Sequence, residues 1–225
     1  MASDDAYYRH LCQGEIKGAH TFVTANLILR QVKSPGWQPK DWLDVGSGSG
    51  FLVAELKKIG IDSVGVEPGG WGQISARDKG ISIVNGLLTE GTFNKRFDAV
   101  SATDVIEHQP DPKPMIRLMK RYMNDNGKMF LSFPFGDSLP AKIRKGKWKM
   151  VVPPTHCNFF TYKSFSRLAD NCDLKIERFY KYSSSGFRGW KKLGLSLSTA
   201  NRLMDAVSLG DQALVVLSLR NSTDK

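Results

Sequence analysis

Three glycines at alternate positions follow a short apolar run, and their spacing suggests a ligand-binding turn. Gly46, Gly48 and Gly50 come directly after the apolar segment 42–45, and a helical pattern of apolar residues begins at Leu52. Glycine allows the backbone to take positive φ angles and to approach a ligand closely. The helix that follows would direct its free N–H groups and the positive end of its dipole toward the same turn. The sequence therefore predicts a strand, a tight turn and a helix that bind a nucleotide-like ligand.

The spacing of these glycines favours one class of ligand. Dinucleotide-binding turns read Gly-x-Gly-x-x-Gly, whereas this turn reads Gly-x-Gly-x-Gly with an aspartate two residues ahead. The pattern resembles the first motif of class I methyltransferases that use S-adenosylmethionine, and it argues against a NAD-dependent dehydrogenase. The resemblance implies that the cofactor is bound by Asp44, Gly46, Ser47, Gly48 and Gly50.

Glu67 is the second residue that the resemblance assigns to the cofactor. It ends a predicted buried strand at 61–66 and is followed by Pro68. In nucleoside-binding α/β folds, a carboxylate about 20 residues after the glycine turn accepts hydrogen bonds from both ribose hydroxyls. The family usually carries an aspartate for the adenine amino group after the third strand, but residues 85–88 read Asn-Gly-Leu-Leu here. We therefore expect backbone groups and the apolar faces of Leu87 and Leu88 to hold the adenine.

The most specific motif follows the predicted fourth strand, 97–102. Residues 104–108 read Asp-Val-Ile-Glu-His, and Pro-Asp-Pro comes two residues later. This closely resembles a motif of the methyltransferase group that includes ubiquinone-pathway O-methyltransferases and many sugar and natural-product methyltransferases. The resemblance places Asp104, Glu107 and His108 at the methionine end of the cofactor and at the rim of the transfer centre.

Two histidines are candidates for a general base. Methyl transfer to a hydroxyl needs a positioned acceptor and a group that removes its proton, and the pKa of histidine lies near neutrality. His108 and His156 lie in segments that resemble family motifs, the second in a segment that lines the substrate pocket of that group, whereas His10 and His20 lie outside them. Glu107 could orient His108 or bind a metal. Adjacent residues on a regular element point apart, so we expect no metal.

The N-terminal residues 1–39 are expected to form a helical cap, because apolar residues between 20 and 32 fall near helical spacing. In the resembling family this region often folds over the cofactor, where a tyrosine and an arginine can reach the methionine carboxylate. Tyr8 and Arg30 are the candidates. An exposed tyrosine and a solvated arginine are equally good interpretations.

The protein is strongly basic, with a formal net charge of +10 and a pI near 9.5. This charge favours an acidic partner such as nucleic acid, an anionic membrane surface or a phosphorylated substrate. A basic segment surrounds Trp148 and contains Lys142, Arg144, Lys145, Lys147 and Lys149. It would either contact phosphates or lipid headgroups, with the tryptophan on a base or at a membrane interface, or form a solvated helix face whose tryptophan packs on the sheet.

The cysteines and the apolar runs indicate the compartment. Cys12, Cys157 and Cys172 are too few and too scattered for a disulfide framework or a Cys-x-x-Cys zinc site. The N-terminus does not resemble a secretory signal, and no apolar stretch is long enough to span a bilayer. We expect a cytoplasmic protein, with peripheral membrane contact possible through the basic surface.

Together these features predict a Rossmann-like α/β fold in one domain, with a cofactor-binding half at 40–134 and a substrate-side half at 135–225. The family resemblance implies a seven-stranded, mostly parallel sheet with helices on both faces and an antiparallel last strand. We expect S-adenosylmethionine-dependent O-methylation of a small molecule, sugar or lipid-linked intermediate. Residues 104–107 lack the Asn/Asp-Pro-Pro-aromatic motif of amino methyltransferases that act on DNA bases, and no cysteine there could serve as a cytosine C5 nucleophile. An RNA methyltransferase that uses the basic surface, and a non-catalytic cofactor-binding module, remain alternatives.

Overall fold

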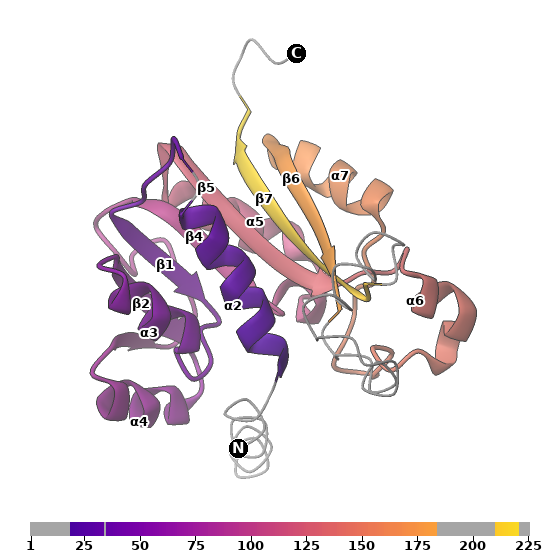
Figure 1. The fold of residues 1–225 in the computed structure, drawn as a ribbon, viewed down its shortest axis with the longest axis horizontal. Helices are drawn as coiled ribbons and strands as arrows, with labels where there is room; N and C mark the ends of the chain where they lie inside the picture. The colour runs from indigo at the N-terminus through magenta and orange to yellow at the C-terminus, as the bar shows by residue number, and fades with distance from the viewer. Residues whose placement is uncertain (1–18, 34, 184–209, 221–225) are drawn as a thin grey trace, which may run out of the picture.

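The computed structural model describes residues 19–33, 35–183 and 210–220, and within this part the chain alternates between strands and helices (Figure 1). The strands are β1 Asp41–Val45, β2 Asp62–Glu67, β3 Ser82–Asn85, β4 Phe97–Thr103, β5 Met123–Pro134, β6 Leu174–Tyr182 and β7 Gln212–Leu219. The helices are α2 Ala19–Val32, α3 Phe51–Lys58, α4 Gly70–Lys79, α5 Pro112–Arg121, α6 Leu139–Arg144 and α7 Tyr162–Asp170, with short 3-10 turns η1 Ile106–His108 and η2 Lys145–Lys147.

All seven strands form one sheet in the order β3-β2-β1-β4-β5-β7-β6. The pairs from β3 to β5 are parallel, and β7 runs antiparallel to both of its neighbours. The predicted mostly parallel sheet with an antiparallel last strand is therefore confirmed. The strand order reverses between β1 and β4, and in open α/β sheets ligands bind outside the carboxyl ends of the strands at such a switch point.

Helices cover the two faces of the sheet with separate apolar cores. On one face, α2 and α3 pack against Trp42 and Phe130, whose rings are 4.9 Å apart between centroids. On the other face, α5 and α7 pack against Leu43, Leu131 and Phe133. Successive residues of a strand point to opposite faces, so neighbours such as Trp42 and Leu43 enter different cores.

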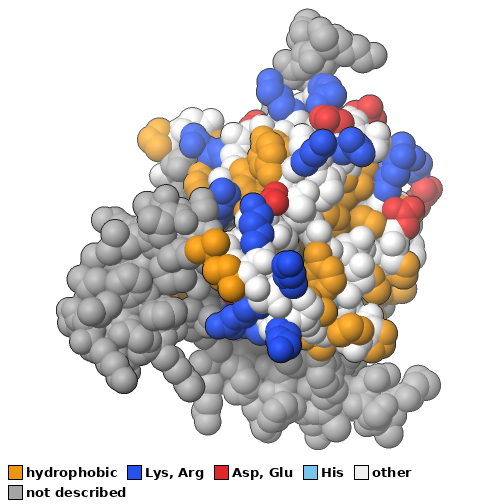
Figure 2. Space-filling model, turned by 90° about the vertical axis from the view of Figure 1, so that its right-hand side faces the viewer, with side chains coloured by type: hydrophobic (Ala, Val, Ile, Leu, Met, Phe, Trp, Pro, Cys, Tyr) orange, Lys and Arg blue, Asp and Glu red, His pale blue; other side chains and the backbone are white. Residues whose placement is uncertain are grey.

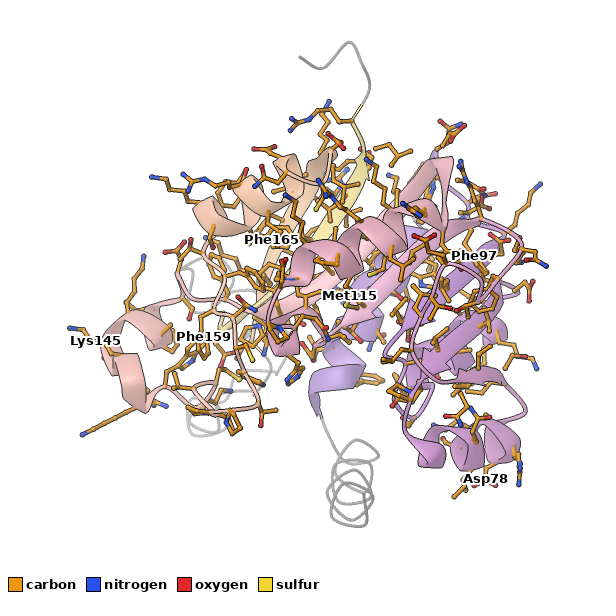
Figure 3. All side chains as sticks on the ribbon, turned by 180° about the vertical axis from the view of Figure 1, so that it is seen from behind. Asp78, Phe97, Met115, Lys145, Phe159 and Phe165 are labelled. Carbon is orange, nitrogen blue, oxygen red and sulfur yellow. The ribbon has the colours of Figure 1, made fainter. Side chains whose placement is uncertain are left out.

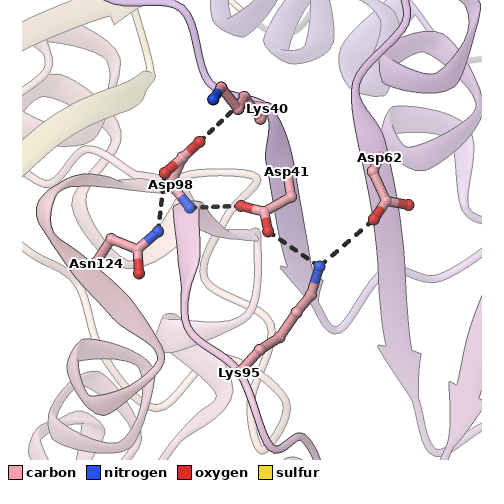
Figure 4. A network of polar contacts seen from close by, with 6 residues as sticks. All are labelled: Lys40, Asp41, Asp62, Lys95, Asp98 and Asn124. Atoms are coloured by element: carbon pink, nitrogen blue, oxygen red, sulfur yellow. Dashed lines mark hydrogen bonds and ion pairs between the residues drawn. The ribbon is translucent and has the colours of Figure 1, made fainter.

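A polar network joins the amino ends of β1, β2 and β4, at the edge of the sheet opposite the glycine turn (Figure 4). The Lys95 ammonium group lies 3.0 Å from Asp41 and 3.4 Å from Asp62. The backbone N–H of Asp98 donates to Asp41, and the Asp98 carboxylate accepts from the Lys40 N–H and from Asn124. These contacts fix the starts of the strands and leave their carboxyl ends for the site.

Most predicted elements occur within a few residues of their expected positions, and β5 is the clearest difference. The sequence predicts a strand at 128–133 after a turn, whereas β5 begins at Met123, because this residue pairs with Phe97 across a register shift. The sequence also predicts a helix at 190–207, and this segment lies outside the described residues. In the described part, no helix is long and apolar enough to cross a membrane. Cys157 is exposed and Cys172 is buried, both as free thiols, and Cys12 falls outside the described range.

Candidate active site

A cavity of about 800 Å³ opens at the carboxyl ends of the central strands. It is bounded at one end by the glycine turn and Glu67, and at the other by η1 and the loop before α7. The described residues that line it include ten of the predicted site residues: Asp44, Gly46, Ser47, Gly48, Glu67, Pro68, Leu87, Asp104 and both candidate histidines. The fold thus brings together motifs that are more than 100 residues apart in the sequence.

The glycine turn has the conformation that its spacing predicts. Gly46, Gly48 and Gly50 have φ angles of 69°, 52° and 65°. A Cβ atom on Gly46 would lie 2.6 Å from a methyl group of Val105, so only glycine lets the turn approach the 104–108 motif. Gly50 is not among the cavity residues, and a Cβ atom there would lie 2.4 Å from Ile81. Gly50 therefore serves the packing of the turn against β3, and its expected contact with a cofactor is not supported.

Glu67 holds the turn from the neighbouring strand. One of its carboxylate oxygens accepts the Gly48 N–H at 3.0 Å, and the other accepts the Gly69 N–H at 2.8 Å. A carboxylate has about four lone-pair sites, so each oxygen retains capacity for a ligand hydroxyl. Gly86, Leu87 and Leu88 line the same end of the cavity, whereas Asn85 is not among the lining residues. This is the arrangement expected for an adenine held by backbone and apolar groups.

Asp44 is a buried carboxyl group at the end of β1, and it accepts a hydrogen bond of 2.6 Å from the Ser101 hydroxyl. Ser101 in turn accepts from the Trp42 indole N–H at 2.8 Å. Burial raises the pKa of Asp44 to about 7; the Ser101 bond opposes this shift, and the negative charge of Glu67 adds to it. No motif in the sequence indicated that Ser101 would be the hydrogen-bond partner of Asp44.

Asp104 follows β4 with a φ angle of 55°, which is uncommon for a residue other than glycine. Its backbone N–H donates to the carbonyl and hydroxyl oxygens of Ser132 at 3.1 and 3.2 Å, and the Ser132 hydroxyl donates to its carboxylate at 3.1 Å. Nearby Glu107 is 1% exposed, and one of its carboxylate oxygens has no hydrogen-bond partner. Burial, and then the charge of Asp104, raise the pKa of Glu107 to about 9.

The two histidines meet although 47 residues separate them: the centroids of their rings are 4.8 Å apart. The carbonyl of Glu107 accepts the N–H groups of Cys157 and Asn158, and this clamps η1 to the loop before α7. His108 Nδ1 bonds to the Thr155 carbonyl at 2.8 Å, and His156 Nδ1 bonds to the Met150 carbonyl at 2.7 Å. A carbonyl can only accept, so Nδ1 is the donor in both contacts and Nε2 is the ring nitrogen left to face other groups.

Glu107, His108 and His156 each offer a ligand atom, and these atoms lie within 4.8 Å of one another. A carboxylate and two imidazoles whose Nδ1 atoms are bonded to carbonyls form a set that a divalent transition-metal ion accepts. The sequence argument against a metal assumed that residues 107 and 108 point apart. That premise does not hold on the short η1 turn, whereas the expectation of no metal stays a prediction.

The N-terminal candidates are placed differently. Arg30 is exposed on α2 and is not among the residues that line the cavity, and Tyr8 lies outside the described residues. Thr24 lies on a different face of α2 from Arg30. It is buried and lines the cavity. Sequence reasoning missed Thr24 because a threonine within a helical pattern carries no signal of its own. It also did not single out the acceptor-end residues Gln109, Met115, Leu118, Val152 and Thr155.

A family model described as a methyltransferase domain matches residues 21–178. This range covers most of the chain and contains the glycine turn, Glu67, the 104–108 motif and His156. The chain belongs to the methyltransferase family. The match confirms the predicted family and supports the S-adenosylmethionine cofactor that the motifs imply.

Curated relatives belong to the group that the 104–108 motif resembles. A ubiquinone biosynthesis O-methyltransferase from Proteus mirabilis is 27% identical over 148 residues, which cover 62% of this chain and 58% of the relative. The corresponding protein from Aeromonas salmonicida is 27% identical over 53% of this chain and 54% of the relative. The matched part of the methyltransferase thus spans little more than half the length of these relatives.

Solved structures share the fold at low sequence identity. A methyltransferase from Thermotoga maritima, described as a possible histamine N-methyltransferase, has a TM-score of 0.65 at 15% identity and covers 95% of this chain and 96% of its own. Magnesium protoporphyrin IX methyltransferase from Synechocystis, solved with bound SAH, has a TM-score of 0.61 at 16% identity, with coverage of 90% and 84%. At this identity they support the fold of the methyltransferase and not its acceptor.

The buried Asp44 carboxyl gives a prediction for the pH dependence of stability. The pKa of Asp44 in the folded protein, about 7, lies above the usual aspartate value of 3.8, so the folded state binds its proton more tightly. The Asp44 contribution to the free energy of unfolding is therefore most favourable at low pH and is lost as pH rises from about 4 to about 7. The difference in unfolding free energy between wild type and Asp44→Asn should fall by up to about 1.4 kcal/mol per pH unit in this window.

Urea denaturation between pH 4.5 and 8 measures this difference. Asp78→Asn, on the exposed face of α4, is the control and should follow the wild-type pH dependence. A pH-independent difference between wild type and Asp44→Asn would contradict the assignment.

Proposed function

We propose that this protein uses S-adenosylmethionine to methylate a hydroxyl group of a small molecule. The observation that carries the proposal is the single cavity that joins the glycine turn and Glu67 at one end to His108 and His156 at the other. The family match and the O-methyltransferase relatives support the same conclusion. The cofactor supplies an electrophilic methyl group, so the protein must hold the acceptor in line and remove its proton.

The residues at the turn fit the cofactor. Glu67 presents carboxylate oxygens for the ribose hydroxyls, and Leu87 and Leu88 offer apolar faces for the adenine. Gly46 and Gly48 leave the floor of the cavity free of side chains. Ser47 also lines the turn, while its buried hydroxyl packs over Gly65 of β2, where a Cβ atom would lie 2.3 Å from it. Asp44 and Asp104 provide carboxyl groups for the methionine end.

His156 is the better placed of the two candidate bases. Burial lowers the pKa of His156; the nearby His108 lowers it further, while its bond to the Met150 carbonyl and the charge of Asp104 act in the opposite direction. The ring is therefore neutral at pH 7, with Nε2 ready to accept a proton from a hydroxyl. His108 packs edge-on against it and positions it in the cavity.

The charges around the cavity favour an acceptor whose reacting end is not anionic. Among the described residues that line the cavity, the acidic ones are Asp44, Glu67 and Asp104, and there is neither a lysine nor an arginine. At the acceptor end, a carboxylate or phosphate on the acceptor would find no lysine or arginine among these lining residues, which is costly in a partly buried site. Met115, Leu118 and Val152 give the acceptor end an apolar wall. A neutral hydroxyl on an apolar body fits this surface.

The basic segment 142–149 lies beside the acceptor end, and we propose that it binds a membrane surface. Ile143 is 70% exposed and Leu139 is 44% exposed on α6, among the exposed cations of 142–149. Figure 2 shows lysines and arginines around apolar side chains on this side of the molecule, and Figure 3 places Lys145 at its outer edge. Val152, a few residues further along the chain, is 43% exposed and also lines the cavity.

This arrangement suits a lipid-linked acceptor at an anionic membrane. Exposed apolar side chains enter the interface while lysines and arginines meet acidic headgroups. Trp148 does not take part, because it is 3% exposed and packs against Phe159 at 5.9 Å between ring centroids. For Trp148 the structure supports the interpretation in which the tryptophan packs inside the protein and does not contact a ligand or membrane.

The cofactor assignment predicts a specific loss of binding. Glu67→Gln should weaken S-adenosylmethionine binding at least about tenfold, because hydrogen bonds to a charged group contribute roughly 1.5–3 kcal/mol. Isothermal titration calorimetry with S-adenosylmethionine, S-adenosylhomocysteine and NAD measures this, and Glu90→Gln, an exposed glutamate, is the matched control. Unchanged affinity in Glu67→Gln, or binding of NAD to the wild type, would sink the assignment.

The base assignment predicts different pH profiles for the two histidine variants. With a panel of phenolic and aliphatic hydroxyl compounds and detection of S-adenosylhomocysteine, His156→Gln should lower kcat by about 10²–10⁴-fold and lose the acidic limb of the profile. His108→Gln should keep that limb. If His156→Gln turns over normally while cofactor binding is intact, another group is the base. Cofactor binding without turnover of any acceptor would favour a binding module.

If the basic segment binds a membrane, binding of the protein to vesicles should depend on the charges of that segment. Lys142→Glu/Arg144→Glu should abolish cosedimentation with vesicles of phosphatidylglycerol and phosphatidylcholine, because each cation near such a surface contributes about 1 kcal/mol. Lys57→Glu/Arg77→Glu makes the same charge change on exposed positions of α3 and α4, and it should bind like wild type. Loss of binding in both variants would indicate attraction by net charge alone. Salt-sensitive RNA binding that depends on residues 142 and 144, with no vesicle binding, would show that this segment binds RNA and not a membrane.

A further inference from the structure

A line of three buried side chains leads from the core of the sheet to the cavity. The Trp42 indole N–H donates to the Ser101 hydroxyl at 2.8 Å, and that hydroxyl donates to Oδ1 of Asp44 at 2.6 Å. Trp42 and Ser101 are fully buried, and Asp44 is 2% exposed. Asp44 and Ser101 are paired residues of β1 and β4, and Trp42 lies two residues before Asp44 on the same face of the sheet. The register of the two strands therefore aligns all three groups.

The direction of these hydrogen bonds follows from the chemistry of the groups. An indole N–H can only donate, so the Ser101 oxygen accepts from Trp42 and its single proton is directed to Asp44. No other described residue donates a hydrogen bond to the Asp44 carboxyl group, and Asp44 lines the cavity. Oδ1 is thus held by the core of the sheet, and Oδ2 is the oxygen left for a ligand.

The surroundings of the Asp44 carboxyl group oppose its negative charge. Glu67 at the end of β2 and Asp104 after β4 line the same cavity, whereas the described residues of α2 and α3 that line it carry no charge. Burial raises the pKa of Asp44 to about 7, the bond from Ser101 lowers it, and the charge of Glu67 raises it. Because no described residue that lines the cavity is a lysine or arginine, a compensating cation has to come from the ligand.

We propose that Ser101 is a positioning residue that holds the Asp44 carboxylate toward the ammonium group at the methionine end of S-adenosylmethionine, with Trp42 fixing the Ser101 hydroxyl. The proposal rests on the proposed function, which places the methionine end of the cofactor at Asp44. The ammonium group supplies the positive charge that the lining residues lack, and Ser101 supplies a hydrogen bond that favours the charged carboxylate. Neither Ser101 nor Trp42 lines the cavity, so each acts on the ligand through Asp44.

A second serine on the same face of the sheet provides a matched control. Ser63 of β2 pairs with Trp42, and its hydroxyl donates to the Val53 carbonyl of α3 at 2.9 Å. Ser63 does not line the cavity. Ser63→Ala and Ser101→Ala each remove one serine hydroxyl from a strand next to β1, but only Ser101→Ala removes a bond to a carboxyl group of the cavity.

Calorimetry compares S-adenosylmethionine with 5′-methylthioadenosine, which keeps the adenosine part and lacks the amino-acid end. Ser101→Ala should weaken S-adenosylmethionine binding at pH 7 by roughly three- to tenfold, the effect of one buried hydrogen bond, and leave the affinity for 5′-methylthioadenosine within about twofold of wild type. Ser63→Ala should leave both affinities unchanged. Because Ser101→Ala also leaves the Trp42 N–H without its acceptor, Trp42→Phe/Ser101→Ala is measured as well and should show the same selective loss.

The pH dependence of binding separates the positioning of Asp44 from a general loss of packing. In wild type, S-adenosylmethionine should bind more tightly as pH rises toward about 7, because Asp44 then loses its proton. In Ser101→Ala this increase should move to higher pH, since the lost bond favoured the carboxylate. An equal loss of affinity for the two ligands, or an unshifted pH profile, would overturn the proposal.

A carbon-13 NMR titration of the Asp44 carboxyl group in the protein without ligand distinguishes failure of this proposal from failure of the proposed function. The signal is assigned with Asp44→Asn. The pKa of Asp44 should be higher in Ser101→Ala than in wild type and unchanged in Ser63→Ala. This result, with neither nucleoside bound by wild type, would uphold the positioning of Asp44 and overturn the proposed function. An unchanged pKa of Asp44 in Ser101→Ala would overturn the positioning role whatever the protein binds.

Discussion

The site is organised around the carboxylate of Glu67, which accepts one backbone N–H from the glycine turn and one from the start of α4. Three left-handed glycines in five residues would otherwise leave the turn between β1 and α3 with great conformational freedom. The carboxylate bridges two adjacent parallel strands at their carboxyl ends and thereby fixes the turn. The residue proposed to bind the ribose is thus also the residue that shapes the floor of the cavity. Loss of its charge would affect both roles together.

The distribution of charge is the second physical feature of the molecule. The chain carries a formal net charge of +10, yet the acidic groups Asp44, Glu67 and Asp104 line the cavity and Glu107 is buried beside it. Burial raises the pKa of both Asp44 and Glu107, because a low-dielectric surrounding disfavours the charged form. A site of this kind attracts a cationic or neutral ligand, while the outer surface attracts anionic ones. The proposed acceptor, with a neutral reacting end near an anionic membrane, meets both conditions.

Backbone hydrogen bonds between η1 and the loop before α7 assemble the acceptor end. The Glu107 carbonyl accepts the N–H groups of Cys157 and Asn158, and His108 bonds to the Thr155 carbonyl. These contacts fix the orientation of both imidazole rings, so that they are held in place before an acceptor binds. Preorganised groups of this kind lose little entropy when a reaction begins.

The sequence by itself determined the elements of the sheet, the glycine turn, the place of Glu67 and the motif around Asp104, because these features depend on local spacing, strand alternation and the needs of a tight turn. It identified His108 and His156 as separate candidates. Only the tertiary structure decided that their rings meet, that Gly50 packs against Ile81 rather than facing the cavity, and that Thr24 rather than Arg30 lines it. Side-chain partners across strands depend on the order and register of the sheet, in which β7 enters between β5 and β6. Asp44 and Ser101, for example, are brought together by the register of β1 and β4, and no local pattern in the chain specifies it.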